Sequence, residues 1–385
     1  MKSYDAPVLK KAKEILGITD AWVTYSWGFS KQTEQEDYRF LEEKLENFQT
    51  LDIKTHAYVQ GTNLVFDEHK EQDYWCRDLQ GRLIPYHRGR ALCCPNNPAF
   101  RNYLAQKVES ACQLAVDGVY VDNFHFGQFP VPLKPFVSFF GCHCSFCQKK
   151  FREKTGKKLP VAFDLRLHET QAYVLFRTQS LMQLAGELSA IAKAHGKQFG
   201  SNSFDTGLDT KLFYGTDSNQ LQAIQDYVLL ENYNHPAAGK NNHQLGQDIR
   251  QSPVPVFIVS YKQAIGKHTA FSQHDINLIH SESMALGYAP CYKASEFTTR
   301  GTWHNLDFFT LQPPSSVEYS TTLNTNTDIS LPGAGFITYL INRFGTLFLE
   351  RMYERPTYRK LFGWIIDRLT TRPAKQKHHP QPAPL

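Results

Sequence analysis

The segment 117–147 constrains the fold more than any other part of the chain. It begins with the apolar run Gly118-Val-Tyr-Val121 and stops abruptly at Asp122-Asn123. A short β-branched run of this kind is typical of a buried parallel strand, whose carboxyl end would point a carboxylate into a cleft. Three closely spaced cysteines follow, Cys142, Cys144 and Cys147, as in metal sites. The segment therefore predicts an α/β enzyme with its chemistry at the strand ends.

Strand-like and helix-like segments alternate along most of the chain. Helical patterns occupy 7–16, 34–49, 98–115 and 165–195. Strand-like runs are found at 21–27, 53–59, 91–94, 117–122, 197–203, 226–232, 254–260 and 289–295. Eight strands separated largely by helices predict an α/β fold, a (β/α)8 TIM barrel, over 20–310. Residues 74–88 predict a hairpin, turning at Gln80-Gly81, inserted in a strand-to-helix loop.

The C-terminal part of the chain differs in composition from the barrel. We divide the chain into a barrel at 1–311, a Ser/Thr/Asn-rich linker or long loop at 312–330, a C-terminal helical extension at 331–371 and a disordered tail at 372–385. Helices in the extension would break at Pro356.

Composition and motifs exclude several functions. The net charge of +5 is too small and dispersed to favour nucleic acid. The N-terminal residues have no apolar signal-peptide core, and no run of about 18 apolar residues occurs, so we expect a cytoplasmic protein. Neither a glycine-rich phosphate loop nor a Gly-x-Ser-x-Gly elbow is present, which disfavours nucleotide chemistry and a nucleophilic serine.

The cysteine cluster predicts a structural zinc ion. Three thiolates from Cys142, Cys144 and Cys147 need a fourth ligand, which either Cys93 or Cys94 would supply from the preceding strand-like run. The alternative is a group of reduced thiols without metal. We interpret His143 as a solvent-facing or packing residue, and the remaining cysteines, Cys76, Cys112 and Cys291, as core or incidental residues.

Three short motifs carry a family resemblance. The run Cys94-Pro-Asn-Asn-Pro-Ala-Phe-Arg101, followed by Asp122-Asn123 and by Cys142-x-Cys144-x₂-Cys147-Gln-x₂-Phe151-Arg152, is similar to the catalytic barrel of glycoside hydrolase family 42 β-galactosidases. The resemblance covers roughly 90–155 by motif and 20–310 by order of elements. It implies that Cys94, Cys142, Cys144 and Cys147 hold a structural zinc that pins two loops.

The sequence departs from that family at the residue that matters most for catalysis. In family 42 a Glu follows the strand-four Asn and acts as acid/base, whereas Phe124 follows Asn123 here. A phenylalanine cannot transfer a proton, so this role does not carry over. The phrase from Asp117 to Asn123 resembles the strand-four ending of α-galactosidase and α-fucosidase barrels, which implies Asp122 as nucleophile or stabilising carboxylate. The alternative is an Asp122 that caps a loop or pairs with an arginine.

A second carboxylate is expected at another strand end. Glu231 is our candidate for the general acid/base, because it ends an apolar strand where burial would raise its pKa. Asp205 and Glu296 compete for this role, and Glu231 would alternatively bind only a sugar hydroxyl. Aromatic and polar residues at strand ends suit a carbohydrate subsite. They are Trp27, Tyr58, Asn123, His125, Asn202, Tyr233, His235, Tyr261 and Lys262.

The sequence therefore predicts a glycoside hydrolase that acts on an oligo- or polysaccharide. A first rival is a barrel that binds carbohydrate without cleaving it, because Phe124 stands where the relatives have their acid. A second rival is a membrane-surface or assembly protein that acts through 333–371, where aromatic residues and leucines alternate with Arg and Lys.

Overall fold

The structure is a computed structural model, which describes residues 2–86, 89–127, 142–161, 167–203, 214–231, 252–260, 270–297 and 310–317. The expected helical extension at 331–371 and the tail at 372–385 lie outside these residues. So does the linker beyond Val317, whereas its beginning runs along α9 (Gln273–Leu286), where the Ser315 amide donates to Asn277 Oδ1.

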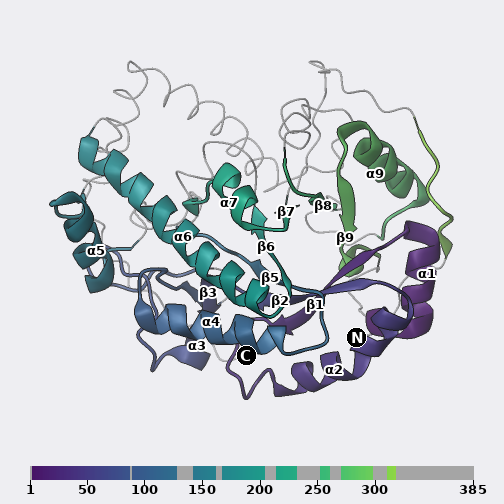
Figure 1. Cartoon of the computed structure of the whole chain (residues 1–385), viewed down its shortest axis with the longest axis horizontal. Coiled ribbons are helices and arrows are strands. Elements are labelled where there is room, and N and C mark those ends of the chain that lie inside the picture. The colour runs from purple at the N-terminus through teal and green to yellow at the C-terminus, as the bar shows by residue number, and fades with distance from the viewer. Residues whose placement is uncertain are drawn as a thin grey trace.

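A seven-stranded parallel sheet forms the centre of the described structure (Figure 1). Its strands, in spatial order, are β1 (Asp20–Ser26), β2 (Lys54–Gln60), β5 (Gly118–Asp122), β6 (Gln198–Ser203), β7 (Tyr227–Glu231), β8 (Val256–Ser260) and β9 (Ala289–Tyr292). Every neighbouring pair is parallel, so all seven carboxyl ends meet at one edge. Chemistry in barrels of this kind is built at that edge.

Aromatic side chains fill the inside of the curved sheet. The Trp22 ring of β1 lies 4.9 Å from the Phe257 ring of β8 and 6.0 Å from the Tyr227 ring of β7, measured between ring centroids. Tyr120 of β5 joins the same cluster. β1 and β8 are far apart in the strand order, so their contact requires a sheet that curls on itself. The predicted α/β barrel class is confirmed.

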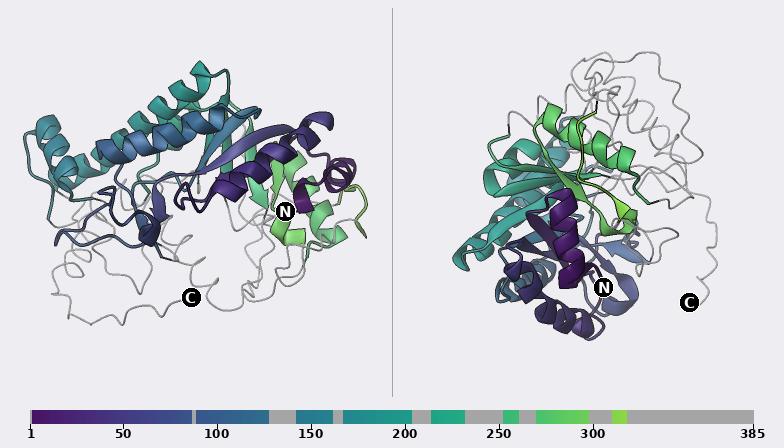
Figure 2. Two further views of the ribbon diagram at one scale, coloured as in Figure 1. Left: turned by 90° about the horizontal axis from the view of Figure 1, so that it is seen from below. Right: turned by 90° about the vertical axis from the view of Figure 1, so that its right-hand side faces the viewer.

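Helices cover the outer surface of the sheet (Figure 2). They are α1 (Ala6–Leu16), α2 (Gln35–Thr50), α4 (Pro98–Cys112), α6 (His168–Ala194), α7 (Ser218–Ile224) and α9, with α3 (Phe66–His69) and α5 (Ser145–Thr155) in the loops. Leu41, Leu45 and Phe48 form the buried face of α2, as its sequence pattern predicted. No helix in the described part of the chain is both long enough and apolar enough to cross a membrane.

The prediction of a third barrel strand at 91–94 was wrong. β4 (Arg90–Leu92) pairs antiparallel with β3 (Asn63–Val65) in a separate two-stranded sheet. β2 bonds directly to β5 along the whole of β5, which leaves no room for a strand between them. The hairpin expected at 74–88 is present, with an antiparallel bridge between Arg77 and Leu83.

Candidate functional site

Asp122 is the last residue of β5, at the carboxyl edge of the sheet, and is 8% exposed. Its backbone is held by the chain that leaves β2. The Gly61 amide donates to the Asp122 carbonyl at 2.7 Å, and the Thr62 amide donates to the Asn123 carbonyl at 3.2 Å. A side chain at Gly61 would put its Cβ only 2.4 Å from that Asp122 oxygen. A glycine is therefore required for this close approach.

Among the described residues, three side chains donate hydrogen bonds to the Asp122 carboxylate. The Tyr58 hydroxyl and the Asn123 amide donate to Oδ2, the latter at 2.7 Å, and the Tyr120 hydroxyl donates to Oδ1 at 3.4 Å. Asn123 makes its contact with a left-handed backbone, at φ 49°. Donors of this kind favour the ionised carboxylate and fix its direction, which suits a nucleophile or an ion that stabilises positive charge.

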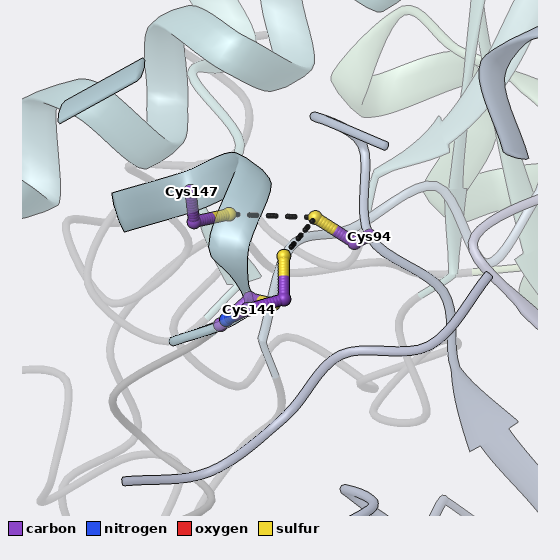
Figure 3. A group of neighbouring side chains, drawn as sticks. Cys94, Cys144 and Cys147 are labelled. Carbon is purple, nitrogen blue, oxygen red and sulfur yellow. Dashed lines mark hydrogen bonds between the residues drawn. The ribbon is translucent and has the colours of Figure 1, made fainter. Parts of the chain in front are cut away.

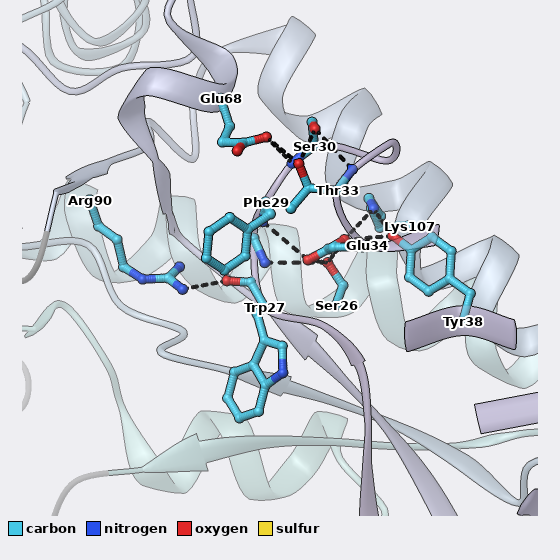
Figure 4. A network of polar contacts seen from close by, with 11 residues as sticks. Ser26, Trp27, Phe29, Ser30, Thr33, Glu34, Tyr38, Glu68, Arg90 and Lys107 are labelled. Carbon is cyan, nitrogen blue, oxygen red and sulfur yellow. Dashed lines mark hydrogen bonds and ion pairs between the residues drawn. The ribbon is translucent and has the colours of Figure 1, made fainter. Parts of the chain in front are cut away.

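An aromatic pair stands beside this carboxylate. The Trp27 ring, 37% exposed, lies 4.8 Å from the Tyr58 ring at a tilt of 48°. Trp27 belongs to the loop after β1, and the buried carboxylate of Glu34 organises this loop (Figure 4). Glu34 accepts hydrogen bonds from the Ser26 hydroxyl and the Phe29 amide, and it pairs with Lys107 Nζ at 2.9 Å. A rigid aromatic face next to a carboxylate is suited to a sugar ring.

Tyr86 of the inserted hairpin and Arg90 of β4 also reach this edge, and the sequence analysis missed both. The Tyr86 hydroxyl donates to Asn123 Oδ1 at 3.3 Å. Arg90 donates from Nη2 to the Trp27 carbonyl at 2.5 Å. The pKa of Arg90 is lowered, because burial outweighs the opposing effect of nearby Tyr58, Glu34 and Asp122. The insertion of a hairpin in a strand-to-helix loop was the available signal, because such loops build the sites of barrels.

The residues after Asn123 turn inward. Phe124 is fully buried in the hydrophobic core, and its amide donates to Asn202 Oδ1 at 3.0 Å. His125 is also fully buried, with Nδ1 2.5 Å from the Gly127 carbonyl, and burial lowers its pKa to about 4. The binding roles of Asn123, His125 and Asn202 stay predictions, and the side chains of His125 and Asn202 are buried.

Several predicted site residues lie outside the described structure. Glu231 is described only by its backbone, as the last residue of β7, paired with Val259 of β8. β6 separates β7 from β5, so Glu231 and Asp122 end strands that are two positions apart in the sheet. The side chain of Glu296 is not among the described ones. Five further residues are outside the described ranges altogether: Asp205, Tyr233, His235, Tyr261 and Lys262.

The four cysteines of the predicted metal site come together. Figure 3 shows three of them, Cys94, Cys144 and Cys147. The sulfur atoms of Cys94, Cys142, Cys144 and Cys147 all lie within 4.8 Å of one another, and Cys94 Sγ is 3.4 Å from Cys147 Sγ and 3.6 Å from Cys144 Sγ. Cys94 follows β4, while Cys142 and Cys144 precede α5 and Cys147 lies in its first turn. The cluster therefore ties the hairpin end to α5.

The donor set fits a tetrahedral metal ion. Four sulfurs bound at about 2.3 Å would lie about 3.8 Å from one another, close to the separations found. The amides of Arg77 and Cys144 both donate to Cys142 Sγ at 3.4 Å, as they would to a thiolate. Burial and Cys142 raise the pKa of Cys94, but hydrogen bonds from Cys144, Cys147 and Cys76 bring it down to about 6. Cys76 thus contacts the cluster from outside the group of four, a position that the sequence analysis did not foresee.

No protein-family model and no curated protein matches the chain. Solved structures do. A β-galactosidase from the psychrophilic Marinomonas ef1 superposes with a TM-score of 0.56 at 13% identity, covering 83% of this chain and 56% of that one. A β-galactosidase from Halorubrum lacusprofundi gives 0.55 at 14% identity, over 79% and 52% of the two chains. The chain has a glycosidase-like fold.

The catalytic domain of a β-amylase from Paenibacillus polymyxa adds a third likeness. Its TM-score is 0.51 at 10% identity, and the match covers 75% of this chain and 88% of that one. The chain spans only about half the length of the two β-galactosidases. At these identities the likeness concerns the fold, so an activity must be argued from the residues at the sheet edge.

Proposed function

We propose that the chain is a glycoside hydrolase that cleaves an O-glycosidic bond of an oligo- or polysaccharide. The observation that carries the proposal is the Asp122 carboxylate, held at the carboxyl end of β5 by donors from Tyr58 and Asn123 beside the exposed Trp27 ring. Asp122 acts as nucleophile or as the charge that stabilises an oxocarbenium-like transition state. Trp27 and Tyr58 hold the sugar ring.

Glu231 serves as general acid/base in this proposal. Its place at the end of β7 gives a second carboxylic acid at the edge where β5 ends. Two strand spacings separate the two backbones by about 10 Å, and side chains that converge on a barrel axis bring the carboxyl groups nearer. Both the retaining separation of about 5–5.5 Å and the inverting one of about 6.5–9.5 Å fit, so the configuration of the released sugar decides between them.

The cysteine cluster holds a structural zinc in the same proposal. Cys94, Cys142, Cys144 and Cys147 supply four buried or half-buried thiols and no open position for a substrate. A bound zinc would cross-link the hairpin end to α5 and stabilise the fold, without a part in the reaction. The kinship with glycoside hydrolase family 42 belongs to this proposal as well.

Turnover of a panel of aryl glycosides and oligosaccharides by the full chain tests the activity. Asp122→Asn should lower kcat/KM at least about 1,000-fold, since it removes the charge and the nucleophile, and Glu231→Gln should do so for substrates with poor leaving groups. Asp117→Asn is the matched control, because Asp117 precedes the opposite end of β5 and accepts from the Thr55 amide. Equal turnover by Asp122→Asn and wild type would exclude the proposed role.

A carbohydrate-binding barrel without catalysis is the second candidate. The burial of Phe124 favours it, because the position that follows Asn123 offers no acid to the sheet edge. This candidate predicts saturable oligosaccharide binding by wild type with no turnover of any glycoside in the panel. Product release detected with wild type and lost in Asp122→Asn would rule it out.

A further inference from the structure

Arg90 has a guanidinium group that the protein uses only in part (Figure 4). Nη2 donates to the Trp27 carbonyl at 2.5 Å, and the group lies 5.8 Å from the centre of the Phe29 ring. Nη1 is buried and has no hydrogen-bond partner among the described residues. Within the described ranges, no carboxylate oxygen lies within salt-bridge distance of Arg90. The guanidinium therefore has a positive charge that no carboxylate in this part of the chain neutralises directly.

This charge lies at the proposed sugar site. Arg90 begins β4 and reaches the loop of Trp27, whose ring packs against Tyr58. The neighbours that influence its charge electrostatically are Tyr58, Glu34, Asp122 and Tyr86. The hydrogen bond to the Trp27 carbonyl is at the exposed rim. The guanidinium is therefore bound to the backbone of the residue whose ring would face the proposed sugar.

A partly buried cation normally has an anionic partner. Removing a charge from water costs free energy unless a carboxylate or phosphate compensates it, and arginine is the side chain best shaped to bind a planar carboxylate. The Asp122 carboxylate accepts hydrogen bonds from Tyr58 and Asn123 instead. A carboxylate on the ligand would complete the environment of Arg90.

We propose that Arg90 and Trp27 form a subsite for an acidic sugar, a uronate residue whose carboxylate binds the guanidinium while its ring stacks on the indole. This inference deepens the proposed glycosidase function and rests on it for the location of the sugar. The competing interpretation is that Arg90 only anchors the Trp27 loop through the Trp27 carbonyl, in which case the ligand's charge is irrelevant.

Paired ligands separate the two interpretations. Oligomers of galacturonate, glucuronate and mannuronate are each compared with their carboxyl-reduced, neutral counterparts of the same linkage. Affinity is measured by calorimetry on the full-length Asp122→Asn protein, so that turnover does not interfere. At least one acidic oligomer should bind about tenfold or more tightly than its neutral counterpart. Its affinity should fall as salt is raised, while the neutral one should be insensitive to salt.

Variants then assign the effect to Arg90. In the same background, Arg90→Gln should abolish the preference for the acidic oligomer, and Arg90→Lys should keep part of it because it keeps the charge. Arg39→Gln is the control, since it removes one positive charge from an exposed position of α2. Circular dichroism checks that each variant is folded. If Arg90→Gln fails to fold, the test relies on the Asp122→Asn protein alone, through the salt dependence of its affinity for the acidic oligomer.

The outcomes distinguish this inference from the proposed function. Equal affinity for acidic and neutral oligomers, failure of every acidic oligomer to bind, or an undiminished preference in folded Arg90→Gln would overturn the subsite. Turnover of neutral glycosides that depends on Asp122 would leave the glycosidase function intact in each of these cases. Acidic binding that depends on Arg90, without any wild-type turnover, would support the subsite and contradict the hydrolase.

Discussion

The Tyr58 hydroxyl donates a hydrogen bond to Oδ2 of Asp122, from one strand of the sheet to the next. Tyr58 is opposite Tyr120 in the register of β2 and β5. Gln60 and Asp122 form the pair two residues further along the strands, on the same face of the sheet. The same tyrosine ring packs against Trp27. Tyr58 thus joins the carboxylate proposed for catalysis to the aromatic face proposed for binding.

Tyr58→Phe should lower kcat/KM about 10- to 100-fold, or about 1.4–2.7 kcal/mol, because a hydrogen bond to a charged group is lost while the ring stays. The control is Tyr103→Phe, since the Tyr103 hydroxyl is buried with no hydrogen-bond partner. That change should leave kcat/KM unaffected. Steady-state kinetics on the best substrate of the panel measures both, and equal losses in the two variants would contradict the role of Tyr58.

Cys147→Ser should remove bound zinc and lower the melting temperature by about 5 °C or more, because metal binding contributes to folding free energy. Cys112→Ser is the control. Cys112 is buried outside the group of four, and burial raises the pKa of its thiol to about 11. Metal analysis of the purified protein should give one zinc per chain for wild type and Cys112→Ser. A full zinc content in Cys147→Ser would show that the cluster is not the binding site.

Asp20→Asn should destabilise the protein at neutral pH by about 1–2 kcal/mol. Asp20 Oδ1 lies 2.9 Å from His56 Nε2. Burial alone would raise the pKa of Asp20, but hydrogen bonds from His56 and Thr19 outweigh it, and the pKa is lowered.

A carboxyl group with a lowered folded-state pKa stabilises the protein above its ordinary pKa of about 4, and this contribution is lost as pH falls through the folded value. The difference between wild type and Asp20→Asn should therefore be constant from pH 7 to about 5 and shrink below about pH 4. Urea unfolding across this range measures it. A difference in unfolding free energy that grows as the pH falls would contradict this role of Asp20.

Gly200→Ala should cost about 2 kcal/mol or more, since its Cβ would lie 2.3 Å from the Tyr227 ring inside the barrel. Gly186→Ala provides the opposite case. Gly186 lies within α6, and a Cβ there would have no neighbour within 4 Å, so alanine should stabilise the helix by about 0.5–1 kcal/mol. Thermal unfolding of both variants tests the packing, and a neutral Gly200→Ala would mean that the interior is not filled by Tyr227.

The sequence predicted the positions of helices and strands better than it predicted which strands pair with one another. The strands later seen as β1, β2 and β5 to β9 were placed within a few residues, because apolar runs and helical periodicity are local properties. The run at 91–94 was assigned wrongly for the same reason. Its apolar residues are buried, but by β3 and the hairpin, and no local pattern tells a barrel strand from a short antiparallel one.

In the candidate site, too, the local features could be predicted from the sequence and the long-range contacts could not. The spacing of Cys142, Cys144 and Cys147 marked a cluster, whereas the choice of Cys94 over Cys93 came from a family resemblance and not from the residues. Arg90 and Tyr86 escaped notice because they reach Trp27 and Asn123 only after the hairpin folds back over the sheet edge. Long-range placement of this kind depends on the register and the loops together.

The burial of Phe124 also limits how this protein can change through evolution or engineering. A single substitution to glutamate at this position would give the chain the same Asn-Glu pair that family 42 has at its strand-four end. It would put the new carboxylate into the core behind the turn, away from any sugar, at a cost of several kcal/mol for an unpaired buried charge. A glutamate at position 124 alone would therefore give an unstable protein before it gave a different enzyme.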